Sequence, residues 1–193
     1  MKKKKIVKND FEESTVVLVK PDGVKRGLIG EVITRFEKLG LKIAGMKMVW
    51  VDEQFVGKHY RDDTKWYKSV GDKLLDFYKE VGYDIGESLG SKDPIEIGKM
   101  VRKWLFVYIT DGPVVAILIK GPHAIELVRK IVGTTYPLNS PPGTIRGDLW
   151  YDSPTLANLG QRSVRNIVHA SGSKEEAEFE KKLWFREDEI YDY

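Results

Sequence analysis

The chain of 193 residues contains no cysteine, which excludes disulfide bonds, thiolate metal sites, iron–sulfur clusters and a cysteine nucleophile. Long apolar runs are lacking too. The longest, Trp104–Ile109 and Val114–Ile119, have six residues each, whereas a helix that crosses a bilayer needs about 20. The N-terminus does not resemble a secretory signal, because Lys2–Lys5 are soon followed by further polar residues. We therefore expect a soluble, cytoplasmic protein.

Strong charge of one sign is also missing. The net charge is +3, and without Lys2–Lys5, which we interpret as a solvated tail, it becomes −1. This balance does not indicate a general nucleic-acid surface. Neither of the common glycine-rich phosphate loops is present, and the sequence has no metal-ligand spacing such as H-E-x-x-H or an EF-hand loop. A phosphate site must therefore be assembled from side chains, and no metal site formed by the protein alone is expected.

Hydrophobic periodicity indicates a βαβ unit, an all-helical excursion and a second βαβ unit. The order predicts one domain over residues 1–193 with a ferredoxin-like βαββαβ sandwich, in which a four-stranded antiparallel sheet carries helices on one face. Alternation in the second strand places Ala44, Met46, Met48 and Trp50 together. The expected strands span 15–19, 42–51, 114–119 and 166–168, and the expected helices span about 29–39, 52–60, 64–81, 94–110 and 124–132, with loops at 82–93 and 134–147 and a last helix capped by Ser173.

Three histidines are candidates for chemistry. A surface or capping role is favoured for His59, near the end of a short helix, and for His123, at a helix start. His169 follows the last strand and leads through small residues to a capped helix, where anions and reacting groups are often held. For His169, a functional and a structural role both remain open at this point.

Three cationic residues are candidates for binding phosphate: Lys20, Arg129 and Arg146. Each is also explained by an ordinary surface charge. Lys20 fits that explanation least well, because it lies between a buried strand and a tight turn. Arg146 lies between Gly143 and Gly147, which predicts a loop that a ligand can approach closely.

Three segments in this order resemble the nucleoside diphosphate kinase family: Val19–Glu31, Gly143–Asp148 and Asn166–Ser171. The resemblance covers residues 14–60, 105–148 and 164–191. It implies a transferase that passes the terminal phosphate of a nucleoside triphosphate to a nucleoside diphosphate by a ping-pong mechanism, through a phosphohistidine and with broad base specificity. It also implies Mg²⁺ held mainly through the nucleotide phosphates, and a homo-oligomer, with hexamer, tetramer and dimer left open.

The resemblance also assigns residues. His169 matches the nucleophile, phosphorylated on Nδ1, and Glu180 matches the glutamate that orients it, although the sequence alone favours one more charge on a solvated helix. Asn166 matches the ligand of the sugar hydroxyl, with Lys20 sharing that contact, and Ser171 matches a residue that supports the site. The family's phosphate contacts map onto Lys20, Tyr60, Arg129, Thr135 and Arg146, of which Lys20 and Tyr60 join His169 and Glu180 as the catalytic set.

Some features depart from the family pattern. Residues 61–103 contain an insertion, a second expansion spans about 149–163, and Gly172 stands in place of an aspartate. Val101 replaces the aromatic residue that stacks on the nucleobase. We expect the insertion to form a helical hairpin at the rim of the cleft and to supply an aromatic from its neighbourhood: Trp66, Tyr67, Tyr83 or Trp104.

Two alternatives stay open. One is a catalytically silent nucleotide- or nucleic-acid-binding module on the same fold, which would not need His169 and Glu180 together. The other is a regulatory oligomer whose insertion covers the cleft.

Overall fold

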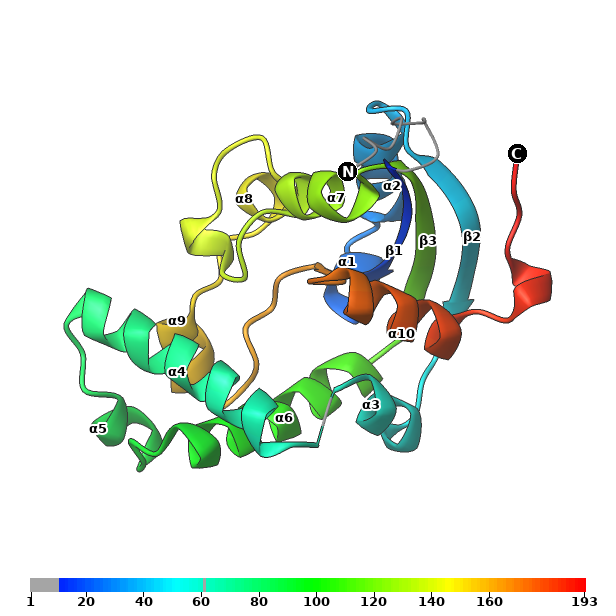
Figure 1. Ribbon diagram of the computed structural model, residues 1–193. Coiled ribbons are helices and arrows are strands. Elements are labelled where there is room, and N and C mark those ends of the chain that lie inside the picture. The colour runs from blue at the N-terminus through cyan, green and yellow to red at the C-terminus, as the bar shows by residue number, and fades with distance from the viewer. Residues whose placement is uncertain (1–10, 61) are drawn as a thin grey trace, which may run out of the picture.

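The computed structural model describes residues 11–60 and 62–193, so the tail Lys2–Lys5 lies outside the described residues. Four strands form one sheet in the order β2-β3-β1-β4, and every neighbouring pair is antiparallel. This is the ferredoxin-like arrangement that the sequence predicts (Figure 1). The strands are β1 (Glu12–Val19), β2 (Lys42–Val49), β3 (Val114–Pro122) and β4 (Val168–Ala170).

Helices cover both faces of the sheet, rather than the single face expected (Figure 1). On one face, α2 (Ile29–Glu37) and α7 (Ala124–Val132) pack against the inward side chains of β1 and β3. On the other face lie α3 (Glu53–His59), α6 (Pro94–Thr110) and α10 (Lys174–Trp184). Every residue of Val16–Val19 is fully buried, because both faces of this central strand are covered.

The insertion forms a helical hairpin, as expected. Helix α4 (Thr64–Val81) ends at Gly82, whose φ of 75° suits a residue without a Cβ. Helix α6 returns alongside α4, with Gly98 against the backbone of Tyr67 and Gly71 against that of Pro94. The loop expected at 82–93 contains a further short helix, α5 (Ile85–Leu89), so that part of the prediction is wrong.

Strand β2 differs from its predicted pattern. Ala44 is buried, whereas the side chains of Met46, Met48 and Trp50 are more than half exposed. The pairing of β2 with β3 shifts between Ile43 and Gly45, and this bulge turns the residues after it to the opposite face.

The remaining elements are short. They are α1 (Pro21–Lys25), α8 (Ile145–Leu149), α9 (Pro154–Leu159) and two 3₁₀ turns, η2 (Pro137–Asn139) and η3 (Glu187–Glu189). Helix α8 begins inside the loop expected at 134–147, and α9 lies within the expansion at 149–163. No helix in the described residues is both long and apolar enough to cross a membrane.

Candidate active site

His169 lies in the middle of β4, opposite Leu18 of β1, and not after the strand as the sequence suggested. Its Nε2 atom is 2.9 Å from both carboxylate oxygens of Glu180, which extends from α10. Ser171 donates a hydrogen bond from Oγ to Glu180 (2.7 Å) and accepts one from the backbone of Val16. Glu180 is only 5% exposed, so the interpretation of it as a charge on a solvated helix is wrong.

The ionisation of Glu180 follows from these contacts. Burial by itself would raise its pKa, but the charge and hydrogen bond of His169, helped by His59 and Ser171, hold the pKa at about 2. Glu180 is therefore a carboxylate at neutral pH and accepts a hydrogen bond from the Nε2–H group of His169. Among the described residues, none forms a hydrogen bond with Nδ1 of His169, so this nitrogen is available for reaction.

His59 belongs to the same cluster, although the sequence favoured a surface or capping role. Its ring lies edge-on to that of His169, with 4.7 Å between centroids, and its Nδ1 atom accepts a hydrogen bond from Trp184 (3.3 Å). Burial, followed by the charge of His169, lowers the pKa of His59 to about 3, which keeps it neutral. The sequence gives no signal for this contact beyond the neighbouring Tyr60.

Lys20 and Asn166 form the polar group next to this cluster. The Nζ atom of Lys20 donates to Asn166 Oδ1 (2.8 Å), and Asn166 Nδ2 donates to the backbone carbonyl of Thr135 (2.9 Å). Lys20 is 4% exposed. Its burial, together with the charge of Arg146, lowers the pKa of Lys20 to about 7. The partner that a buried lysine requires is therefore Asn166, a neutral amide.

Arg146 lies in the first turn of α8 and is buried, which contradicts the expectation of an open loop between glycines. Its guanidinium donates to four backbone carbonyls, those of Gly133, Thr134, Asn166 and Val168, at 2.6–3.3 Å. Burial lowers its pKa to about 10, so it stays charged at neutral pH. Through these hydrogen bonds, Arg146 connects the segment before α8 to the segment that contains Asn166 and His169.

A strained residue immediately precedes β4. Ile167 has a φ of 66°, in the left-handed region that branched side chains disfavour. Two hydrogen bonds hold it there: its N–H donates to Asp22 Oδ2 (3.1 Å), and its carbonyl accepts from the backbone of Lys20 (2.7 Å). The expected strand at 166–168 is therefore displaced to Val168–Ala170. Asp22, which sequence reasoning missed, lies in the turn Lys20–Gly23, and that turn was the only signal for it.

The remaining candidates, Tyr60, Arg129 and Thr135, lie around the His169 cluster and differ in how far they are buried. Tyr60 is buried beside His59, with 4.8 Å between ring centroids, and burial raises its pKa. Arg129 and the side chain of Thr135 are exposed. Arg129 approaches the loop after β4, where a Cβ on Gly172 would lie 3.6 Å from its Nη1 atom. All the site residues assigned by resemblance therefore gather around β4.

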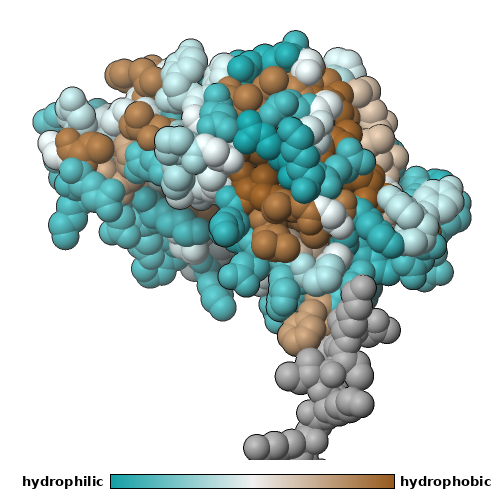
Figure 2. Space-filling view, turned by 90° about the horizontal axis from the view of Figure 1, so that it is seen from above, coloured by the Kyte–Doolittle hydropathy of each residue, from teal (hydrophilic) through white to brown (hydrophobic). Residues whose placement is uncertain are grey.

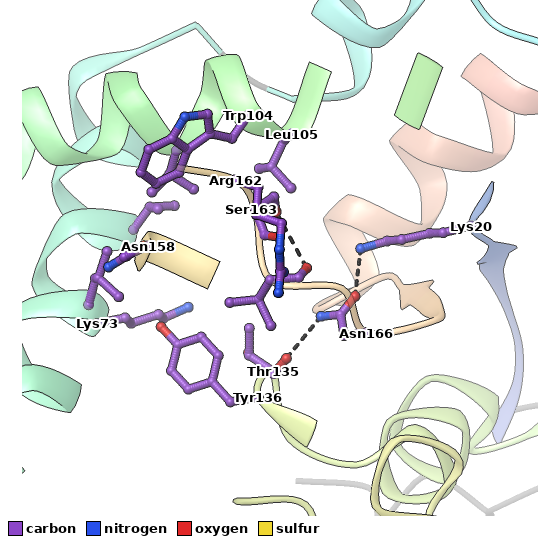
Figure 3. Close-up of a pocket in the computed structure, with 14 residues that line it drawn as sticks. Lys20, Lys73, Trp104, Leu105, Thr135, Tyr136, Asn158, Arg162, Ser163 and Asn166 are labelled. Atoms are coloured by element: carbon purple, nitrogen blue, oxygen red, sulfur yellow. Dashed lines mark hydrogen bonds between the residues drawn. The ribbon is translucent and has the colours of Figure 1, made fainter. Parts of the chain in front are cut away.

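A cavity of about 170 Å³ adjoins Lys20 and Asn166 (Figure 3). It lies between the α4–α6 hairpin and the segment 158–166. Of the aromatic residues considered for nucleobase stacking, Trp104 lines this cavity. The other three lie elsewhere: Trp66 packs near Tyr60, Tyr67 is buried between the hairpin helices, and Tyr83 is exposed beyond the end of α4.

In the described part of the chain, one cluster has the residue types of a metal site: His59, His169 and Glu180, whose ligand atoms lie within 4.8 Å of one another. Mg²⁺ prefers six oxygen ligands, several of them water or phosphate. Two imidazoles and one buried carboxylate do not fit a resident Mg²⁺. The cluster fits a histidine oriented by a carboxylate.

Comparison with known proteins agrees with this geometry. The family model for nucleoside diphosphate kinase matches residues 13–80 and 96–190. A nucleoside diphosphate kinase of Pyrobaculum aerophilum is 48% identical over 178 residues, covering 92% of this chain and 97% of that protein. One from Pyrococcus abyssi is 43% identical over 182 residues, covering 94% of this chain and 89% of that protein.

Solved structures give the same result. A crystal structure of an NDP kinase from Pyrobaculum aerophilum superimposes with a TM-score of 0.89 at 46% identity, covering 94% of this chain and 100% of that one. A transition-state mimic of nucleoside-diphosphate kinase from Borrelia burgdorferi, with bound vanadate and ADP, has a TM-score of 0.76 at 35% identity, covering 95% of this chain and 93% of that one.

Proposed function

This chain belongs to the nucleoside diphosphate kinase family, and we propose that the ring of His169 carries the phosphoryl group in the reaction that this enzyme catalyses. The enzyme is a phosphotransferase that moves phosphate from a nucleoside triphosphate to a nucleoside diphosphate. The observation that supports the role of His169 is the pair of 2.9 Å contacts between its Nε2 atom and Glu180.

In the proposed mechanism, the lone pair of His169 Nδ1 attacks the terminal phosphorus of the triphosphate. The bond from that phosphorus to the bridging oxygen breaks, and the nucleoside diphosphate leaves with the bond's electrons. The proton on Nε2 stays in place, because the carboxylate of Glu180 accepts its hydrogen bond and stabilises the positive charge that develops on the ring. A second nucleoside diphosphate then takes the phosphoryl group from Nδ1, which returns the ring to neutral imidazole.

Positive charge around the phosphates supplies most of the remaining catalysis, because phosphoryl transfer depends on positioning and charge stabilisation. Arg129 is exposed and can move towards a phosphate, with Tyr60 and Thr135 as hydrogen-bond donors. Lys20 and Asn166 are suited to a sugar hydroxyl as well, because they already share a hydrogen bond. Arg146 contributes positive charge. Its main role is to position Asn166 and His169, because its guanidinium donates to four backbone carbonyls around them.

Mg²⁺ enters this proposal with the nucleotide. The cluster of His59, His169 and Glu180 does not suit this ion, so we propose that it is held mainly through the nucleotide phosphates and water. When bound there, it would neutralise phosphate charge. The chain's own contribution is the group of cations described above.

We also propose that residues 1–193 form one domain that assembles as a homo-oligomer in the cytoplasm. Apolar side chains are exposed on edge strand β2, at Met46 and Met48, and directly after it, at Trp50, and they are the kind of surface that another subunit covers. Figure 2 shows a hydrophobic area bordered by hydrophilic residues on one side of the molecule. Nucleic acid is not an expected partner, given the small net charge.

Labelling with γ-labelled ATP tests the phosphohistidine. We expect an acid-labile, alkali-stable label on the wild-type protein and none on His169→Ala. His123→Ala is the matched control, because His123 lies at the start of α7 outside the cluster and should leave the label intact. Label retained by His169→Ala would move the nucleophile elsewhere. An unlabelled wild-type protein that still binds ADP would favour the silent binding module.

A further inference from the structure

The geometry points to Lys73 as a residue that selects nucleobases: we propose that the cavity between the α4–α6 hairpin and the segment 158–166 binds the base and favours those that present carbonyl oxygens at their edge. This inference rests on the proposed function, because it takes Lys20 and Asn166 as the sugar and phosphate end of the site. It concerns a part of the site formed by the insertion and by the expansion.

The cavity extends away from the phosphate end of the site. Lys20 and Asn166 line one side of it, and Lys73 and Asn158 line the other (Figure 3). Lys73 comes from α4, in the insertion, and Asn158 comes from α9, in the second expansion. A nucleotide whose sugar contacts Lys20 and Asn166 would therefore direct its base towards Lys73.

The volume and the lining of the cavity suit an aromatic ring. Trp104 of α6 and Tyr136, beside η2, lie on opposite sides of it in Figure 3. Its volume of about 170 Å³ compares with roughly 150 Å³ for a cavity that holds benzene. Apolar side chains of α4 and α6, among them Leu74 and Leu105, complete the walls. Stacking on Trp104 accepts any base, so it does not explain selection.

Selection among the bases comes from the charged side chains that line the cavity. Lys20, Lys73 and Arg162 line the cavity, and no carboxylate of the described residues does. Arg162 is not free to contact a base, because its guanidinium donates to both carboxylate oxygens of Asp152. Asn158 is uncharged, and one of the two N–H groups of its amide donates to Tyr78 (2.8 Å).

Lys73 is the remaining cation at the base end. Its side chain is exposed, and its ammonium forms no ion pair within the described part of the chain. Its flexible stem allows the three N–H donors to follow a base edge. Tyr136 offers a hydroxyl nearby, and burial raises its pKa to about 12, so the hydroxyl keeps its proton.

The bases differ in what they show to such donors. Guanine presents O6 and N7 and uracil or thymine presents O4, all acceptors, whereas adenine and cytosine present an exocyclic amino group at the matching position. Lysine donates to the former and repels the latter. A good contact of this kind discriminates by at least about 5-fold, so the wild-type enzyme should prefer GTP over ATP and UTP over CTP.

Single-turnover labelling of the full chain with γ-labelled GTP, ITP, ATP, UTP and CTP tests this. We expect GTP and ITP to exceed ATP in kcat/KM by about 5-fold or more, because ITP keeps O6 and N7, and UTP to exceed CTP. In Lys73→Met both ratios should fall towards one. Lys79→Met, on the same helix but outside the cavity lining, should keep the wild-type ratios.

Three results would overturn the inference: equal rates for all bases in the wild type, unchanged ratios in Lys73→Met, or a GTP preference that ITP does not share. Each of these leaves the proposed function intact, because the histidine is still labelled. Failure of every triphosphate to label the protein would instead contradict the proposed function.

Discussion

The Nε2 atom of His169 lies 2.9 Å from both carboxylate oxygens of Glu180, so the carboxylate decides which ring nitrogen carries the proton. A proton on Nε2 leaves the lone pair on Nδ1, the nitrogen that has no partner among the described residues. The carboxylate itself is fixed by Ser171, which connects it to the backbone of β1. This chain of contacts gives the ring one tautomer and one orientation.

Replacing Glu180 by glutamine tests this relationship. The amide keeps the size of the side chain but loses the charge that stabilises the developing imidazolium, so we expect the rate of histidine labelling to fall by roughly 10²-fold or more. KM should change little, because Glu180 is buried behind the ring. Stopped-flow or quenched-flow labelling separates the two parameters. Glu178→Gln on the exposed face of α10 is the control, and an equal rate in Glu180→Gln would mean that the ring needs no anionic partner.

Arg146 and Arg129 should respond differently to truncation. Arg146→Ala leaves four carbonyls without their donor, so we expect the free energy of unfolding to fall by about 2–4 kcal/mol, along with activity. Arg129 is exposed, so Arg129→Ala should change stability by less than about 0.5 kcal/mol. It should still weaken kcat/KM by about 1–3 kcal/mol through the lost phosphate contact. Denaturant unfolding beside steady-state kinetics distinguishes them, and equal stability of both variants would contradict the positioning role of Arg146.

Lys20 should couple nucleotide binding to proton uptake. Burial, then Arg146, lowers its pKa to about 7, so Lys20 is charged below pH 7 and largely neutral at pH 8.5 in the free enzyme. A bound polyphosphate restores the charge. We therefore expect close to one proton to be taken up per ADP at pH 8.5, and affinity to fall by up to about tenfold per pH unit above 7.

Calorimetry in buffers of different ionisation enthalpy measures this uptake. Lys20→Arg is the matched variant, because a guanidinium stays protonated at pH 8.5 and should bind ADP without uptake. Equal uptake in both proteins would assign the proton to another group.

The sequence predicts the parts of the fold that depend on neighbouring residues. The spacing of apolar residues and Gly82 predict a helix over 64–81, and the structure confirms these limits for α4; it adds Asp63 as the cap, which accepts a hydrogen bond from the N–H of Trp66. The turn after β1 and the cap at Ser173 follow from local chemistry in the same way.

The errors come from contacts between distant segments. The bulge in β2 places Gly45 where a Cβ would lie 2.8 Å from the carbonyl of Glu189, a contact that no pattern within β2 indicates. His59 is buried because Trp184 and His169 surround it, and both lie more than 100 residues away. The resemblance assigned Glu180 and Arg146 to the site. It did not indicate that the Arg146 guanidinium donates its hydrogen bonds to backbone carbonyls.

The hairpin of α4 and α6 should govern nucleotide affinity without governing the chemistry. Gly98 lies against the backbone of Tyr67, so a methyl group at Gly98 would overlap the Tyr67 carbonyl and force the two helices apart. Gly98→Ala should therefore lower stability by about 1–3 kcal/mol and raise KM for all nucleotides, since Trp104 and Lys73 line the cavity from the two helices. The maximal labelling rate should change little, because His169 and Glu180 belong to other elements.

Gly30→Ala in α2 is the control: no atom lies within 4 Å of a Cβ there, so it should have wild-type affinity and equal or slightly greater stability. A Gly98→Ala protein with a widened hairpin and wild-type KM would mean that the base binds outside this cavity.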